Sequence, residues 1–83
     1  MIRDELEVLL REVLAHEMDL SPEEVRLEMS LREELDLNSL DATNVLMTLE
    51  DRLKVEADLE DFLELQTVGD LLDYMIRLVG TEA

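Results

Sequence analysis

Apolar residues recur at the three- and four-residue spacing of an amphipathic helix in three stretches of the chain. The first stretch ends near His16, the second runs from about Ser39 to Leu53, and the last ends at Gly80. In order, the apolar positions are Ile2, Leu6, Leu9, Leu10, Val13 and Leu14; Ala42, Val45, Leu46, Leu49 and Leu53; and Val68, Leu71, Leu72, Met75, Ile76 and Val79. These stripes predict three longer helices that pack their apolar sides together.

Capping residues predict where the later helices begin and add a short one. Asn38 or Ser39 is expected at the N-cap of the second helix. Asp58 has the character of a cap for a short third helix over about residues 59–64. The run from Thr67 to Asp70 resembles a capping box with Asp in place of Glu, which places the start of the last helix there.

The stretch between the first two long helices, residues 17–37, is long for a connection. Its run Ser21-Pro22-Glu23-Glu24 joins a capping box to a proline at the first helical position and predicts a short helical turn. Four apolar positions follow at intervals, which a freely solvated loop would not require: Val25, Leu27, Leu31 and Leu35. We therefore expect this loop to be packed against the core.

Composition favours helices over a sheet. The chain has 83 residues with one Pro and two Gly, which predicts a single domain over residues 1–83 without linkers. Hydrophobic residues make up 47% of it but aromatic residues only 2%, so the core is built from aliphatic side chains and Met. The expected fold is all-α: a four-helix bundle of three longer helices and one short helix, with a long packed loop between helices 1 and 2.

The net charge of −16 restricts the partners of the chain. With 23 acidic residues against 7 basic ones, binding to nucleic acid or to anionic lipid is not expected, and partners with basic patches are. The sequence has no Cys, no apolar run long enough to span a membrane and no signal-peptide pattern at its start. These features predict a monomer in the cytoplasm without membrane insertion.

The second predicted helix carries apolar residues on its polar face as well. Leu40 and Met47 project opposite the buried stripe, at about 100° per residue. Asn44 and Asp51 share that side, with Asp41, Thr43 and Glu50 beside them, and Asn38 at the helix start is counted with the docking residues. Apolar side chains surrounded by acids suit a transient docking surface for a basic partner. In the alternative, Met47 packs under the short helix and Leu40 staples the helix start.

Ser39 lies at the head of this helix, after a loop of acidic residues and leucines. A hydroxyl at the positive end of a helix dipole is well placed for a phosphodiester, because the backbone N–H groups of the first turn have no helical partners.

The residues around Ser39 resemble the acyl carrier proteins. The resemblance rests on Glu34-Leu35-Asp36-Leu37-Asn38-Ser39-Leu40-Asp41 and on Leu46-Met47-Thr48-Leu49-Glu50-Asp51. It extends to Asp58–Leu65, Thr67–Asp70 and Asp73-Tyr74-Met75, so nearly the whole chain is covered and the expected bundle is acyl-carrier-like.

This resemblance implies that Ser39 is esterified by 4′-phosphopantetheine, transferred from coenzyme A by a magnesium-dependent phosphopantetheinyl transferase. Acyl intermediates of fatty-acid, lipid or polyketide-type biosynthesis would be held on this arm as thioesters. The partners implied are acyl-loading, ketosynthase or acyltransferase enzymes with basic docking patches. Acyl chains would lie between the helices, so candidate pocket residues, each equally explained as ordinary core, are Val45, Leu49, Phe62, Leu63, Leu71, Leu72 and Tyr74.

Three positions depart from the usual pattern of the family. Asn38 stands where the family normally has Asp, and Asp36 where it commonly has Gly. Asn38 keeps a carbonyl that can cap the helix, whereas Asp36 lacks the freedom of glycine at positive φ and is expected to give the loop a different turn. Asn44 replaces an acid of the housekeeping fatty-acid carriers. These changes predict a specialised carrier whose modification survives but whose partner preference is altered.

Other functions fit the sequence less well. An EF-hand loop starting at Asp36 would need Gly at position six and Glu at twelve, where Asp41 and Met47 stand, so no metal site is predicted. The only histidine, His16, has no paired nucleophile near it in sequence, so no catalytic residue is expected and the chain is not predicted to be an enzyme. An acidic helical adaptor without a prosthetic group, and a carrier of aminoacyl cargo, remain open alternatives.

Overall fold

The computed structural model describes residues 3–79, and these form an all-α fold with the predicted order of elements. The helices are α1 (Arg3–Met18), α2 (Ser39–Leu53), α3 (Leu59–Glu64) and α4 (Val68–Val79), with a 3₁₀ turn η1 (Pro22–Glu24) in the long loop. The fold class, the four helices and the turn at Pro22 are therefore confirmed. Ile2 of the first predicted stripe and Gly80, the predicted end of the last helix, lie outside the described residues.

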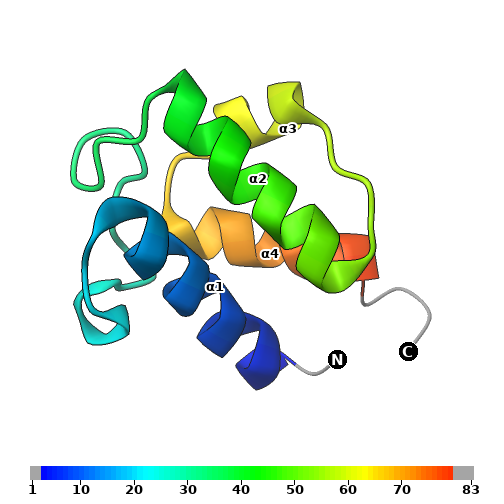
Figure 1. Cartoon of the computed structure of the whole chain (residues 1–83), viewed down its shortest axis with the longest axis horizontal. Helices are drawn as coiled ribbons and strands as arrows, with labels where there is room; N and C mark the ends of the chain where they lie inside the picture. Colours follow the sequence, from blue (N-terminus) through cyan, green and yellow to red (C-terminus); the bar gives the residue numbers. More distant parts are fainter. Residues whose placement is uncertain (1–2, 80–83) are drawn as a thin grey trace.

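The three longer helices pack around one core. In Figure 1, α2 crosses in front of α4, α1 lies beside both, and the short α3 lies next to α2. The apolar stripes face inward because burial of these side chains is the main favourable term in folding. The side chains buried to less than 2% exposure are Leu6, Leu10, Leu14, Val25, Val45, Val68, Leu71, Leu72 and Met75.

Helix α1 is two residues longer than predicted. It ends at Met18 because Asp19 adopts a left-handed backbone conformation with φ of 60°. The N–H of Leu20 then donates back to the carbonyl of Ala15 at 2.8 Å, which satisfies one of the carbonyls left free at a helix C-terminus. Gly is the usual residue at such a position, so an aspartate gave no sequence signal for this end.

The long loop is packed, as predicted. Val25, Leu31 and Leu35 are buried and Leu27 is half-buried against the core. The loop is also tied to the start of α4 by backbone bonds, from Leu31 N to Gln66 O (2.9 Å), from Val68 N to Met29 O (3.0 Å) and from Gly69 N to Leu27 O (2.7 Å). These bonds fix the path along which the chain approaches α2.

Capping fixes the helix starts. The side chains of Thr67 and Asp70 exchange hydrogen bonds with each other's backbone N–H at 3.0 and 3.2 Å, which confirms the capping box of α4. The Asp58 carboxylate accepts from the N–H of Glu60 at 2.9 Å and caps α3 as predicted.

Candidate functional site

Ser39 is the first residue of α2, and Asn38 is its N-cap. The Asn38 side-chain oxygen accepts a hydrogen bond from the N–H of Asp41 at 2.8 Å, so the amide keeps the capping role that the sequence predicted for it. Ser39 is exposed, and its hydroxyl makes no hydrogen bond within residues 3–79. The backbone N–H groups of Ser39 and Leu40, in the first turn of α2, precede the i−4 ladder and so have no acceptor within the helix. The Ser39 hydroxyl is therefore presented at the positive end of α2, where a phosphodiester would fit.

The loop before Ser39 corrects one expectation. Asp36 was expected to give this loop a turn different from the one that glycine allows, yet it adopts a left-handed conformation with φ of 57°. Asp reaches this region more readily than most residues because its short polar side chain bonds locally. Asp36 thus keeps the backbone conformation that glycine, the common residue of the family at this position, would favour.

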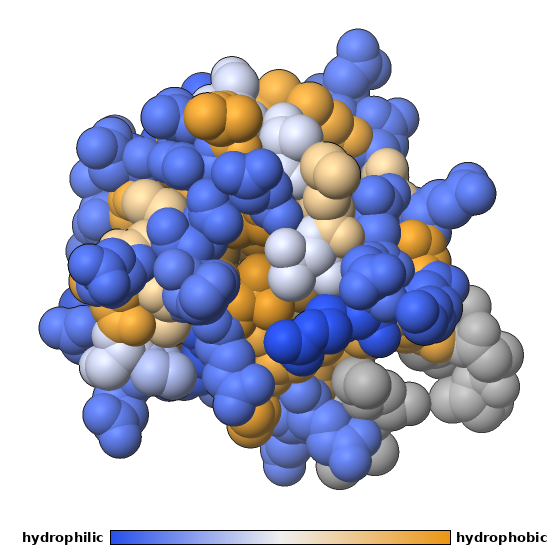
Figure 2. Space-filling model, in the orientation of Figure 1, coloured by the Kyte–Doolittle hydropathy of each residue, from blue (hydrophilic) through white to orange (hydrophobic). Residues whose placement is uncertain are grey.

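The outward side of α2 carries exposed apolar side chains. Leu40 is 69% exposed and Met47 is 60% exposed, so neither packs under α3 or against the helix start. The alternative in which these two side chains are structural is therefore wrong for this conformation. Figure 2 shows the face across which α2 runs as mostly hydrophilic, with separate apolar patches.

The acidic and amide residues beside them differ in what they contact. The Glu50 carboxylate accepts from the N–H of Ala57 at 2.7 Å and so anchors the segment after α2. Asp51 is exposed and lies 4.0 Å from the ammonium of Lys54. Asn44 donates to the carboxylate of Glu17 at 3.1 Å. Glu17, near the end of α1, therefore lies beside Asn44 of α2. The residue spacing along α2 does not predict this contact.

The seven pocket candidates are part of the closed core. Six of them are buried, and Leu63 is half-buried. The hydroxyl of Tyr74 accepts from the N–H of Asp58 at 3.1 Å and lies 3.5 Å from the Asp61 carboxylate, so Tyr74 ties the start of α3 to α4. Only Phe62 and Leu63 line the small cavity between the long loop, α2 and α3. The other residues around that cavity, which the sequence did not single out for it, are Leu31, Arg32, Leu37, Ala42 and Leu65.

Comparison with known proteins shows the family to which the chain belongs. A family model described as a phosphopantetheine attachment site matches residues 8–75, which include Ser39 and span α1 to α4. The chain belongs to the acyl carrier protein family. The family resemblance and the 4′-phosphopantetheine cofactor expected from the sequence are confirmed, and the family is one of carriers that interact with a phosphopantetheinyl transferase and with biosynthetic enzymes.

Named relatives agree with this assignment. The chain is 36% identical over 70 residues to an acyl carrier protein from Chlamydia trachomatis, with 84% of this chain and 91% of that protein covered. It is 33% identical over 66 residues to an acyl carrier protein from Wolinella succinogenes, with 80% and 87% covered.

The carrier fold agrees as well. The crystal structure of an acyl carrier protein from Thermotoga maritima superposes with a TM-score of 0.79 at 25% identity, covering 98% of this chain and 94% of that one. An acyl carrier protein from Enterococcus faecalis superposes with a TM-score of 0.77 at 23% identity, with 94% and 99% covered, and supports the fold alone.

Two further observations concern residues 3–79 of the carrier. No helix in that range is both long enough and apolar enough to cross a membrane. Within the same residues, no group of three or more His, Asp or Glu side chains is arranged to hold a metal ion.

Proposed function

We propose that Ser39 carries 4′-phosphopantetheine and that the chain holds acyl intermediates as thioesters on this arm. The observation that supports the proposal is the exposed Ser39 hydroxyl at the first residue of α2, which lies inside the matched residues 8–75 and makes no hydrogen bond to any of residues 3–79. Ser39 accepts the group and does not catalyse its transfer. The chain itself has no Cys, so the thiol that carries the acyl group comes from the arm.

Loading in vitro tests the proposal. The protein is incubated with coenzyme A, magnesium and a promiscuous phosphopantetheinyl transferase, and the product is weighed by mass spectrometry and mapped by peptide fragmentation. We expect one phosphopantetheine per chain, on the peptide that contains Ser39. A protein that gains no such mass would support the acidic adaptor without a prosthetic group instead.

We propose that the outward side of α2 is the surface on which basic partner enzymes dock. Leu40 and Met47 would contribute desolvated contact, and Asp41 and Asp51 would orient the partner by charge. Asn44 lies on the same side of α2, and Asn38 stands at the start of the helix as its N-cap. The contact of Glu50 with Ala57 favours a structural role for that carboxylate over a docking one.

Met47→Glu should weaken this docking while leaving the fold intact. A carboxylate in place of the apolar Met47 side chain would lose its water shell when the partner binds. We therefore expect kcat/KM of the phosphopantetheinyl transferase to fall about tenfold. Val8→Glu is the matched control, because Val8 is an apolar residue of similar exposure (55%) on a different helix, α1. Equal losses in the two variants would show that Met47 is not a docking residue.

The specialised role inferred from Asn38 and Asn44 stays a prediction, and a comparison of carriers tests it. We expect the general fatty-acid ketosynthase to elongate acyl groups on this chain more slowly than on a housekeeping carrier. Asn38 and Asn44 are neutral, so this chain lacks two negative charges that would attract a basic partner. Elongation rates are measured side by side on fully loaded proteins. Equal rates would contradict the prediction.

The remaining expectations are untested. The single domain over residues 1–83, the monomeric state, the cytoplasmic location, and acyl rather than aminoacyl cargo stay predictions. Acyl cargo is the proposal that the relatives' names support.

A further inference from the structure

A small apolar cavity lies next to the first turn of α2. Its volume is about 20 Å³, and its apolar lining includes Leu37, Ala42 and Phe62. This is room for about one water molecule and not for an acyl chain. For a chain to enter between α2 and α3, the space between these two helices has to widen.

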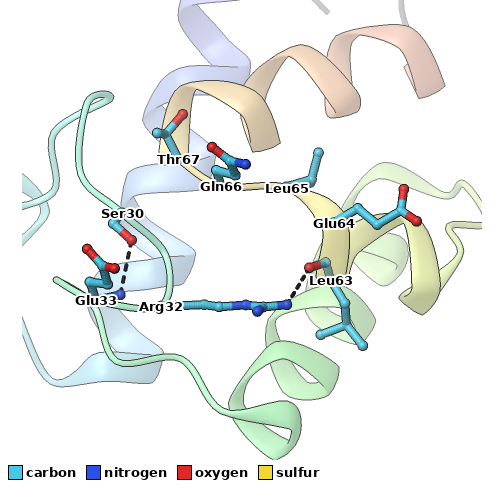
Figure 3. Close-up of a pocket in the computed structure, with 8 residues that line it drawn as sticks. All are labelled: Ser30, Arg32, Glu33, Leu63, Glu64, Leu65, Gln66 and Thr67. Carbon is cyan, nitrogen blue, oxygen red and sulfur yellow. Dashed lines mark hydrogen bonds between the residues drawn. The ribbon is translucent and has the colours of Figure 1, made fainter.

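A second, open groove of about 680 Å³ lies outside this cavity. Figure 3 shows its lining residues, with the Arg32 side chain extended from the long loop across the gap to α3. Arg32, Leu63 and Leu65 line both the groove and the inner cavity. The bridge from Arg32 to Leu63 therefore forms part of the wall that separates the two spaces.

The bridge is a hydrogen bond to a helix end. The Arg32 guanidinium donates from Nη2 to the backbone carbonyl of Leu63 at 2.7 Å, in the last turn of α3. Carbonyls there lack helical partners and carry the negative end of the dipole, so a cation is favourable. Arg32 makes this contact although Glu33 and Glu64 line the same groove.

Helix α3 depends on such contacts. It has six residues, too few for a helix that is stable by its own hydrogen bonds. Tyr74 of α4 holds its first end through the N–H of Asp58, and Arg32 of the long loop holds its last end. The two ends of α3 are therefore tied to different elements of the fold.

We propose that Arg32 is a latch that sets the acyl-chain length above which this carrier encloses its cargo between α2 and α3. The inference rests on the proposed function. Enclosure of a chain breaks the bond between Arg32 and Leu63, and burial of the chain offsets that loss. One net hydrogen bond and one or two buried CH₂ groups are similar in free energy. Removal of the latch should therefore lower the threshold by about two carbons.

The first test uses the unmodified protein. Arg32→Met keeps the apolar stem and removes the donors, and Arg26→Met is the matched control, since Arg26 lies in the same loop and pairs locally with Glu28 at 3.1 Å. We expect hydrogen exchange of the α3 amides to rise about three- to tenfold in Arg32→Met and to stay unchanged in Arg26→Met. An unchanged α3 in Arg32→Met, or equal changes in both variants, would overturn the latch. Arg32→Lys, which keeps a cation and a donor, should restore part of the protection.

The second test uses loaded protein with butanoyl, hexanoyl, octanoyl and decanoyl groups. An enclosed thioester reacts slowly with hydroxylamine, so the rate of cleavage reports whether the acyl chain is enclosed. Arg32→Met should become protected at an acyl chain about two carbons shorter than the shortest chain that is protected in the wild type. The same chain-length dependence in Arg32→Met and wild type would overturn the latch. Failure of the proposed function can be told apart from failure of the latch. The first would appear as no gain of phosphopantetheine mass on loading, whereas hydrogen exchange of the α3 amides in the unmodified protein still tests the role of Arg32.

Discussion

Ser39→Ala is expected to abolish attachment of phosphopantetheine and to leave the fold unchanged. The substitution removes the only atom that can accept the phosphoryl group at the head of α2. Ser39 is exposed and its hydroxyl makes no hydrogen bond within residues 3–79, so the change in the free energy of unfolding should stay within about 0.5 kcal/mol. The expected result is total loss of the mass gain with an unchanged melting temperature.

The chain offers two matched controls for this variant. Ser21 and Ser30 lie in the long loop and are its other serines, so Ser21→Ala and Ser30→Ala make the same chemical change elsewhere. Both should load fully, although Ser30→Ala removes the acceptor of a 3.0 Å bond from the N–H of Glu33. Loading of Ser39→Ala at the rate of these two controls would exclude Ser39 as the attachment residue.

Leu72→Ala should lower the free energy of unfolding by about 3 kcal/mol. Leu72 has 0% exposure in the middle of α4, so its truncation removes buried apolar surface and leaves a cavity. A chain of 83 residues has a total stability of about 4 to 12 kcal/mol. The melting temperature should fall by roughly 10 to 25 °C.

Denaturant unfolding followed by circular dichroism measures this loss, with Val8→Ala as the control at an exposed position. The control should change the free energy of unfolding by less than about 0.5 kcal/mol. Near-equal stabilities of Leu72→Ala and wild type would mean that the Leu72 site is loosely packed, as expected of the wall of an expandable pocket. The large loss is the result expected for ordinary core.

Helix starts were predictable from the sequence, and some helix ends were not. Asn38, Asp58 and Thr67 cap through bonds to residues two or three positions away, so the signal is local. Helix α1 ends at Met18 because the next residue, Asp19, has a positive φ, which a sequence pattern does not predict for an aspartate. The same is true of the turn at Asp36, where the expectation based on a missing glycine was wrong.

The candidate site divides in the same way. The place of Ser39 and the side of α2 on which Leu40 and Met47 lie follow from capping residues and helical periodicity, whereas the exposure of these two side chains needed the structure. The contact between Glu17 and Asn44 joins residues 27 positions apart, and the bond from Arg32 to Leu63 joins residues 31 apart. Such contacts depend on how α1, α3 and the loop pack against α2, which no local pattern encodes.

The bonds that tie the long loop to the start of α4 use main-chain atoms alone. Leu27, Met29 and Leu31 pair with the segment from Gln66 to Gly69 through N–H and C=O groups, and at Gly69 an added Cβ would stand 3.2 Å from the Leu27 carbonyl. Substitution of the loop's outward-facing side chains leaves these groups in place, except where proline removes an N–H. The loop surface can therefore diversify toward different enzymes during evolution while its path to Ser39 stays the same.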